Sequence, residues 1–175
     1  MAATEIISAF SYACNTISAK LARGERVLLQ DVSFSLSSGE RMAIIGETGS
    51  GKTMLALSIL GLLPANVRMQ SGCVQMDGDA LPSGKQLQTL RGDKLVYIPQ
   101  NGAEFLLPVR TVRKQLYDSL KKLGLPRKDF PAFAAEKLRL AGFDAPETIL
   151  DKYPFQLSGG MAQRVTIALA ACSRA

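Results

Sequence analysis

The chain has 175 residues, enough for one well-buried domain or a domain with a small insertion. Its composition, 47% hydrophobic and 21% charged, is that of an ordinary globular protein, and no apolar stretch approaches the ~20 residues of a membrane-spanning helix. The net charge of +6 raises the possibility of nucleic acid or an anionic membrane surface as partner, but no run of Lys and Arg exceeds two residues, which favours an ordinary basic surface.

The residue inventory excludes some kinds of chemistry. There is no histidine, which excludes histidine-based catalysis within these residues. The three cysteines, Cys14, Cys73 and Cys172, are far apart and lack metal-ligand spacing, so we expect reduced cytosolic thiols. Residues 1–5 lack the basic-then-apolar form of a signal peptide.

Two β-rich runs open the chain. Residues 6–10 and 26–36 carry β-branched and aromatic residues, and a polar break at 22–25 separates them. Polar and apolar residues alternate from Asp31 onward, which predicts a strand with one buried face. A turn at 37–40 follows. We expect an antiparallel sheet here, packed beside a parallel one.

A glycine-rich loop comes next, between an apolar run at 42–45, expected to be a strand, and one at 54–60, expected to be a helix. Residues 46–53 fit the phosphate-binding pattern G-x-x-x-x-G-K-[ST] at every fixed position. Glycines allow tight turns and close approach to a ligand, and N–H groups at a helix start attract phosphate. Lys52 would reach the β- and γ-phosphates of a nucleotide, and the Thr53 hydroxyl would ligate Mg²⁺. The predicted binding residues of this loop are Gly46, Glu47, Thr48, Gly49, Ser50, Gly51, Lys52 and Thr53.

Strand-like sequence returns beyond the loop helix. Gly61 and Pro64 end the helical pattern, and residues 72–81 predict a strand with a tight Asp-Gly turn. Residues 95–98 form a short apolar run that we expect to be a strand, with Gln100 at its tip.

The pattern becomes helical between Gln100 and Pro154. Residues 111–123 and 130–141 carry apolar residues at helical spacing, with prolines and glycines at their edges. They predict a helical insertion of roughly 55 residues, bracketed by sheet-type sequence.

A second glycine motif follows this insertion. Residues 157–164 read Leu-Ser-Gly-Gly-Met-Ala-Gln-Arg and lead into an apolar helical run at 165–171. Ser158 can cap this helix and donate to a phosphate, while Gly159 and Gly160 expose N–H groups. Taken alone, the motif favours an ordinary helix start.

Together the features resemble the ATP-binding cassette (ABC) ATPases. These share a phosphate loop, a glutamine ending a strand (here 48 residues after Lys52), a helical insertion and then Leu-Ser-Gly-Gly-x-x-Gln-Arg. The resemblance covers residues 4–175. It implies an α/β fold, a RecA-like P-loop NTPase core with an N-terminal antiparallel β subdomain and an inserted α-helical subdomain. The implied boundaries are 1–99 and 159–175 for the core and 100–158 for the helical subdomain.

The resemblance also implies roles for single residues. In this family the signature of one subunit closes on the nucleotide held by another, so that two ATP molecules lie in a head-to-tail dimer. The signature residues that would bind the partner's ATP are Ser158, Gly159, Gly160 and Gln163. Lys52 and Gln100 are the implied catalytic residues, and Thr53 and Gln100 are the implied Mg²⁺-binding residues. The implied cofactors are ATP and Mg²⁺.

Further segments look like the oligopeptide, dipeptide and nickel importer branch: Gly61-Leu62-Leu63-Pro64, Leu90-Arg91-Gly92 and Tyr153-Pro154-Phe155-Gln156. Peptide members usually have histidine at the position of Phe155, and phenylalanine there is similar to nickel-type members. Both peptides and nickel or metal chelates stay open as cargo. The implied location is the cytoplasmic face of the inner membrane. The implied partners are a second ATP-binding subunit, integral membrane permease subunits and a periplasmic or lipid-anchored solute-binding protein, with no nucleic acid.

The sequence departs from the family pattern after the signature helix. It stops at Arg174-Ala175, before the family's Asp-Glu strand and histidine loop. We therefore expect these residues to contain the nucleotide-binding part of the ATPase and to be inactive as an ATPase on their own. Without that neighbouring strand the core would carry unpaired backbone groups, each costing about 1–3 kcal/mol when buried, and would be aggregation-prone.

Two smaller departures concern the nucleotide and the membrane subunit. The hairpin region 20–24 lacks the aromatic residue that usually stacks on adenine; Tyr12 lies too far upstream unless the hairpin is long, and Arg23 could stack instead or be a solvated turn residue. Residues 101–108, after Gln100, also differ from the branch pattern.

Two other functions compete with the importer ATPase. One is a non-catalytic nucleotide-binding module that pairs with a complete ATPase. The other is a DNA-repair or chromosome-structure ATPase, which shares the signature but inserts a long coiled coil before it. The short insertion here has no sustained heptads, which disfavours the second alternative.

Overall fold

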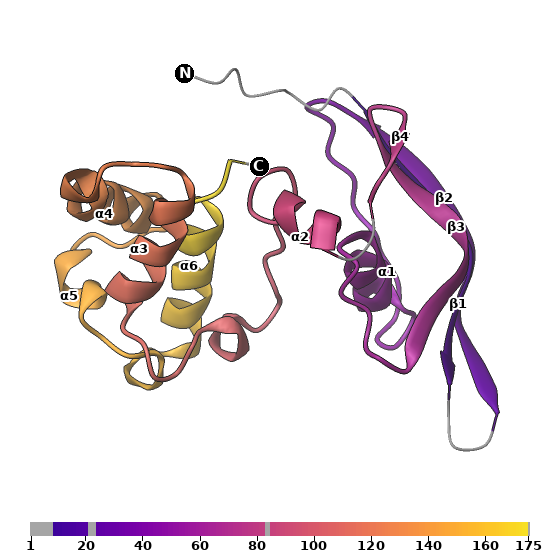
Figure 1. The fold of residues 1–175 in the computed structure, drawn as a ribbon. Coiled ribbons are helices and arrows are strands. Elements are labelled where there is room, and N and C mark those ends of the chain that lie inside the picture. The colour runs from indigo at the N-terminus through magenta and orange to yellow at the C-terminus, as the bar shows by residue number, and fades with distance from the viewer. Residues whose placement is uncertain (1–8, 21–23, 83–84, 175) are drawn as a thin grey trace. The chain divides into compact units, whose positions relative to one another are not determined.

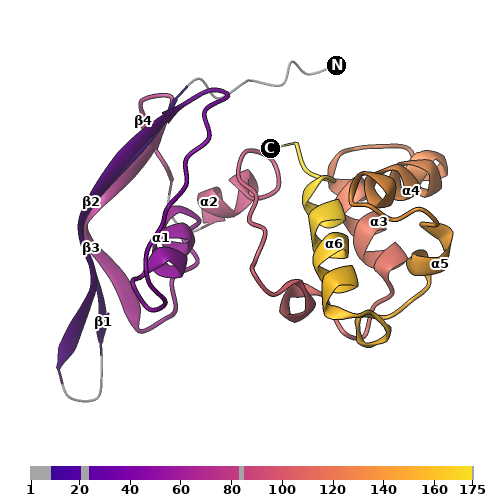
Figure 2. The ribbon, with the colours of Figure 1, turned by 180° about the vertical axis from the view of Figure 1, so that it is seen from behind.

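The computed structural model describes residues 9–20, 24–82 and 85–174. These residues form two compact units, Met1–Arg91 and Gly92–Ala175, and each is described by itself. Figures 1 and 2 show both units from opposite sides.

An antiparallel sheet of four strands forms the frame of the first unit (Figure 1). Its strands are β1 (Ala9–Lys20), β2 (Glu25–Ser37), β3 (Val67–Met76) and β4 (Asp79–Ala80), in the order β2-β1-β3-β4. The register places Tyr12 of β1 opposite Phe34 on one side and Val74 on the other. In β2, Phe34 is half-buried between exposed Ser33 and Ser35, which confirms the predicted strand with one buried face.

The predicted Asp-Gly turn is confirmed as the two-residue link between β3 and β4. Asp77 has φ 54° and Gly78 has φ 87°, so both adopt the left-handed conformation that suits a tight hairpin turn. The Asp77 carboxylate also accepts a hydrogen bond from the Ala9 N–H at 2.9 Å, which ties the turn to β1. Strand β3 begins at Val67, five residues before the predicted start at 72.

Two helices complete the first unit, α1 (Lys52–Ile59) and α2 (Lys85–Leu90). Helix α1 places buried Leu55 in the same core cluster as Tyr12 and Ile17 of the sheet. Within this core the Ser58 hydroxyl donates to the Leu55 carbonyl at 2.7 Å and accepts from the Tyr12 hydroxyl at 2.8 Å. Gly61, with φ 61°, follows the helix, which confirms the predicted helix end.

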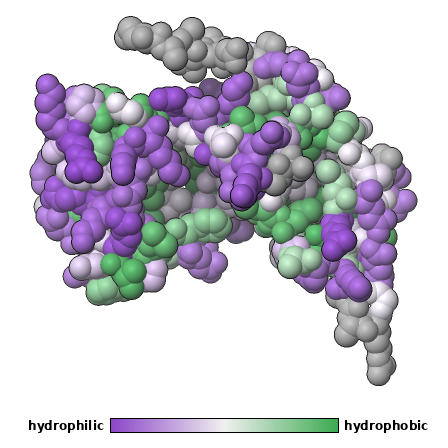
Figure 3. Space-filling model, viewed as in Figure 1, coloured by the Kyte–Doolittle hydropathy of each residue, from purple (hydrophilic) through white to green (hydrophobic). Residues whose placement is uncertain are grey.

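The second unit is helical, as predicted for the insertion. Its helices are α3 (Val112–Lys122), α4 (Phe130–Leu140), α5 (Glu147–Leu150) and α6 (Gly159–Ala170). A 3-10 helix at Gly102–Phe105 precedes them. They share one apolar core, in which Leu116, Leu138 and Val165 are fully buried. The face of this unit seen in Figure 3 is mostly hydrophilic, as expected for helices whose apolar sides meet in the core.

The expected parallel strands are not formed by the described residues. Residues 42–45 and 95–98 have no regular strand, and the four strands that do form are all antiparallel. Ile45 is 94% exposed and Ile98 is 46% exposed. An apolar run becomes a strand only when a neighbouring strand satisfies its backbone groups, and no described segment supplies one. The predicted boundaries 1–99, 100–158 and 159–175 remain predictions. None of the helices in the described residues is long and apolar enough to cross a membrane.

Candidate functional site

The glycine loop at 46–53 has a backbone that only glycine adopts easily. Gly49 has φ 87° and Gly51 has φ 94°. A Cβ at Gly51 would also lie 2.6 Å from Leu29 Cδ2 and 3.1 Å from the Leu28 carbonyl oxygen. Gly51 is therefore required both for the turn and for its close approach to β2. It sits at the N-terminal cap of α1, so that loop and helix form one continuous unit.

The side chain of Lys52 lies inside this loop. Its Nζ donates to the Gly46 carbonyl at 2.7 Å and the Glu47 carbonyl at 2.6 Å, and it lies 3.3 Å from Ser50 Oγ. The Ser50 N–H closes the turn on the Glu47 carbonyl at 3.2 Å. The ammonium group is thus held where the loop backbone curves around it.

The arrangement fits a polyphosphate. The loop combines a lysine ammonium group with the N-terminal end of an eight-residue helix whose first turn carries no acidic side chain. Residues 41–50 are all exposed, so the loop is open to a ligand. Thr53 is also exposed, and its hydroxyl can serve as one oxygen ligand for a metal ion.

A metal ion here would depend on the phosphates. The described residues contain no group of three or more His, Cys, Asp or Glu side chains that could hold a metal ion. In loops of this pattern a Ser or Thr hydroxyl binds Mg²⁺ together with the substrate phosphates, which agrees with Thr53 as the only such ligand in the loop pattern.

The structure confirms that Ser158 caps the signature helix. Its Oγ accepts a hydrogen bond from the Met161 N–H at 3.3 Å at the start of α6. Gly159 and Gly160 are exposed, do not have positive φ, and have nothing within 4 Å of where a Cβ would lie. Neither the backbone nor internal packing requires glycine at these positions. Their small size therefore matters only for something that approaches from outside the unit.

Gln163 lies one turn further along α6 and reaches the segment that carries Gln100. Its Oε1 accepts from the Gly102 N–H at 2.7 Å, and its Nε2 donates to the Pro99 carbonyl at 2.9 Å. Gln100 itself is exposed. The structure thus brings Gln163 and the Gln100 segment together within the second unit, whereas the phosphate loop belongs to the first unit.

Gly102 is a residue that sequence reasoning missed. A Cβ there would lie 2.7 Å from both Gln163 Cα and Thr166 Oγ1. The Thr166 hydroxyl lies 3.2 Å from the Gly102 carbonyl oxygen and 3.0 Å from the Ala162 carbonyl oxygen. The only local signal was a glycine two residues after Gln100, because the residues that require it lie more than sixty positions away in the sequence.

The two residues considered for stacking on adenine are Tyr12 and Arg23, and the structure describes only Tyr12. Tyr12 is 1% exposed, so its ring belongs to the core of the first unit. It packs on Phe34 with ring centroids 5.3 Å apart. Arg23 lies outside the described residues.

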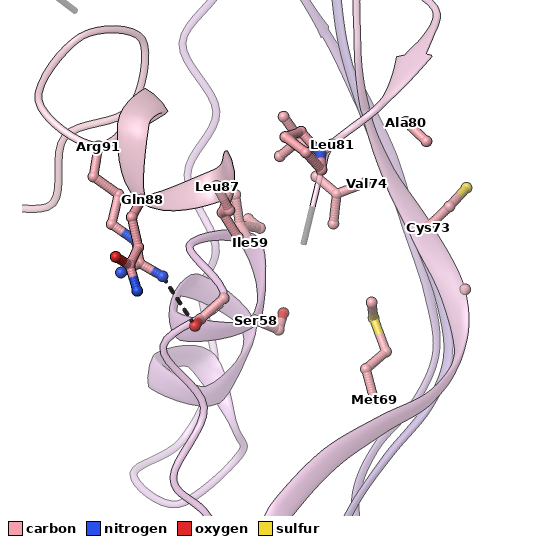
Figure 4. A pocket seen from close by; sticks show the side chains of 13 residues that line it. Ser58, Ile59, Met69, Cys73, Val74, Ala80, Leu81, Leu87, Gln88 and Arg91 are labelled. Atoms are coloured by element: carbon pink, nitrogen blue, oxygen red, sulfur yellow. Dashed lines mark hydrogen bonds between the residues drawn. The ribbon is translucent and has the colours of Figure 1, made fainter. Parts of the chain in front are cut away.

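A cavity of about 470 Å³ lies in the first unit, between α1, α2 and β3 (Figure 4). Leu81, Val74, Met69 and Leu87 make much of its wall apolar. Arg91 lies at its edge, where its guanidinium donates to the Leu60 carbonyl at 2.8 Å and to the Gly61 carbonyl at 3.1 Å. None of the predicted site residues lines this cavity.

Clear pKa shifts occur in the second unit. The guanidinium of Arg113 donates to both carboxylate oxygens of Asp151 at 2.8 Å, and this hydrogen bonding lowers the pKa of Asp151 below 3.8 and raises the pKa of Arg113. Burial raises the pKa of the Cys172 thiol to about 11. These shifts accompany structural contacts rather than a catalytic group.

Sequence comparisons with known proteins agree with the motifs of this site. The sequence profile of the ABC transporter family matches residues 29–175. The nickel import ATP-binding protein NikD of Brucella abortus is 36% identical over 151 residues, which are 86% of this chain and 56% of that protein. The oligopeptide transport ATP-binding protein AmiE of Streptococcus pneumoniae is 34% identical over 150 residues, 83% of this chain and 42% of that protein. The chain thus spans about half the length of these curated relatives.

A solved structure matches the fold. The bacterial ABC transporter cassette MJ0796, described as dimeric, superimposes with a TM-score of 0.80 and 26% sequence identity. The match covers 93% of this chain and 69% of that one. The antiparallel sheet and the helices of the two units are therefore parts of one known fold.

Proposed function

Since this chain belongs to the ABC transporter family, near the ATP-binding proteins of peptide and nickel importers, we propose that it binds Mg·ATP in the loop 46–53. We further propose that it is the ATP-binding subunit of an importer for peptides or for nickel or another metal chelate. Binding and hydrolysis of ATP in the whole assembly would drive uptake.

The position of Lys52 is the observation that carries this proposal. Its ammonium group is fixed inside a loop whose glycines Gly49 and Gly51 adopt positive φ, and the loop continues directly into α1. The site thus combines a fixed ammonium group, a backbone that can approach a ligand closely and the N-terminal end of a helix. These features suit the β- and γ-phosphates of a nucleotide.

The proposed roles follow from the chemistry of each side chain. Lys52 neutralises phosphate charge as the γ-phosphoryl group leaves, and Thr53 supplies a hydroxyl ligand to Mg²⁺. A bound Mg²⁺ would be held in part by the Thr53 hydroxyl and would supply positive charge that offsets the phosphates. Gln100 orients the attacking water. The chain's own contribution is therefore positioning and electrostatic stabilisation, with no covalent intermediate.

Ser158, Gly159 and Gly160 would act on a nucleotide held by a second cassette. The open space around both glycines supports this proposal, since glycine is not needed there for the fold of the second unit itself. The named relative MJ0796 is dimeric, which supports pairing of two cassettes. The further partners that we propose are integral membrane permease subunits at the cytoplasmic face of the inner membrane and a solute-binding protein.

Replacing the central cation tests the proposed binding site. In the whole protein we expect Lys52→Ala to weaken equilibrium binding of Mg·ATP by at least about tenfold, because a charged hydrogen bond contributes about 1.5–3 kcal/mol. Binding can be followed by calorimetry or a fluorescent nucleotide. The matched control is Lys114→Ala, which removes an exposed lysine from α3. Equal affinity of Lys52→Ala and wild type would contradict the proposal.

A non-catalytic nucleotide-binding module is the second candidate function. On this alternative, the chain lends its loop and its signature to a complete ATPase partner. The two functions differ in turnover by the assembled pair. If the chain is an active subunit, Lys52→Ala lowers ATP turnover at its own site; if it is a module, turnover at the partner's loop continues.

A further inference from the structure

The Gln163 side chain connects the signature helix α6 to both ends of the Gln100 segment. The Gln163 amide spans from the Pro99 carbonyl, at 2.9 Å, to the Gly102 N–H, at 2.7 Å. These two backbone groups flank Gln100 and Asn101 on either side. The bridge is therefore centred on the part of the chain that carries the proposed water-orienting residue.

A second set of contacts holds the same segment independently. The Thr166 hydroxyl lies 3.2 Å from the Gly102 carbonyl oxygen, one helical turn beyond Gln163. Gly102 lies so close to α6 that a Cβ would come within 2.7 Å of the Gln163 Cα atom. Both Gly102 and Thr166 are buried. The segment is therefore bonded and packed directly against α6.

We propose that Gln163 is a positioning residue, which couples the signature at 158–160 to Gln100 through the backbone of residues 99–102. The inference rests on the proposed function, since it assigns a partner-sensing path within that same ATPase site. When the nucleotide of a second cassette binds at the N-terminal end of α6 and displaces this helix, the amide of Gln163 transmits the displacement to Gln100. Gln163 acts on hydrolysis through Gln100 and not by touching the nucleotide.

The chemistry explains why glutamine suits this position. Its amide offers a donor to the Pro99 carbonyl and an acceptor to the Gly102 N–H at the same time. Glutamate keeps the acceptor but replaces the donor with a second oxygen that repels the Pro99 carbonyl. Methionine has a similar length and provides neither strong donor nor strong acceptor. The series Gln, Glu, Met therefore removes the two bonds stepwise.

The first readout is amide hydrogen exchange at single-residue resolution in the whole protein. We expect the Gly102 N–H to exchange about tenfold faster in Gln163→Met, because its hydrogen bond is lost. It should stay protected in Gln163→Glu, which retains the acceptor. The control Gln86→Met makes the same chemical change at an exposed site in α2 and should leave Gly102 unaffected. Unchanged Gly102 exchange in Gln163→Met would overturn the proposal.

The second readout is ATP turnover by the assembled transporter. We expect Gln163→Met to lower kcat about tenfold and Gln163→Glu to lower it less, with little change in KM for ATP, since the nucleotide contacts are kept and Gln100 is displaced. In a Gln100→Ala background, Gln163→Met should cause no further loss, because the two residues act as one unit. A raised KM with normal kcat, or fully additive losses, would overturn the proposal and favour a direct nucleotide contact.

These outcomes separate the inference from the function on which it rests. A wild-type protein that neither binds nor turns over Mg·ATP would overturn the proposed function, and the coupling with it. A wild type that turns over ATP while Gln163→Met does so at the same rate would overturn the coupling alone.

Discussion

Glycines occur in both halves of the proposed site, but for different physical reasons. Gly51 has φ 94° and no room for a Cβ, so its identity follows from the fold of the first unit. Gly159 and Gly160 have neither constraint. Glycine at position 51 is required by the fold of the first unit, whereas the open space at Gly159 and Gly160 would, by our proposal, receive the nucleotide of a partner cassette. This difference could not be predicted from sequence, where both motifs present only as glycine-rich helix starts.

Single residues were predictable where their chemistry is local. Lys52 and Ser158 each act within six residues of their own position, and the structure places Lys52 in the loop and Ser158 at the helix cap. Gly102 and Thr166 depend on each other across 64 positions, so that no spacing rule connects them. For Gln163 the structure shows backbone contacts, on which the proposed positioning role rests in place of the nucleotide contact expected from the sequence.

The cysteines give a prediction at this scale. Cys172 is buried in the core of the second unit, where burial raises the pKa of its thiol to about 11, whereas Cys73 is exposed. Since the thiolate is the reactive form, we expect iodoacetamide at pH 8 to modify Cys73 promptly and Cys172 only after unfolding. Peptide mass mapping over time measures both rates. Equal rates for the two thiols in the folded protein would contradict the burial of Cys172.

Whole elements were predictable where their signals are continuous in sequence. Helices α3 and α4 lie within one residue of the periodic runs at 111–123 and 130–141. The runs at 42–45 and 95–98 have strand-like composition, yet they form no strand among the described residues. A helix satisfies its own backbone, whereas a strand needs a neighbour, so local composition predicts helices more safely.

An ion pair between α3 and the end of α5 gives the prediction at the scale of elements. The hydrogen bonds from Arg113 lower the pKa of Asp151, so the carboxylate stabilises the folded unit above pH 3.8, and this contribution is lost as the pH falls below that value. We expect Asp151→Asn to lower the Tm at pH 7, and the difference from wild type to shrink as the pH falls through the lowered pKa of Asp151. Melting curves across this range decide the matter. A constant difference in Tm would show that the pair does not act through the charge of Asp151.

At the scale of the whole molecule, the family and fold were predictable because four motifs occur in a fixed order. The structural superposition on the cassette MJ0796 covers 93% of this chain. The arrangement of the two units could not be predicted from these motifs. The phosphate loop and the signature lie in separate units and, by our proposal, act on nucleotides held by different subunits. The motifs do not predict the transported cargo either, because the cassette is not expected to contact it.

Stability belongs to this scale as well. Residues 42–45 and 96–98 expose Met42, Ile44, Ile45, Val96 and Ile98. Apolar strand-like segments without partners are prone to pair between molecules. We therefore expect a polypeptide of these 175 residues alone to aggregate on heating. Calorimetry with a repeat scan measures this. A cooperative transition that recovers fully on the second scan would refute the expectation.

ATP-dependent pairing of two cassettes tests the central claim most directly. The molecular mass of the whole protein, with the second cassette that it joins, should be measured by light scattering with and without a non-hydrolysable ATP analogue. We predict that the mass rises from one cassette to two only with nucleotide. The rise should be lost with Lys52→Ala and with Gly159→Val, a change that the open space around Gly159 tolerates in the single chain. Pairing that ignores the nucleotide, or that persists in Gly159→Val, would contradict the claim that loop and signature form one shared ATP site.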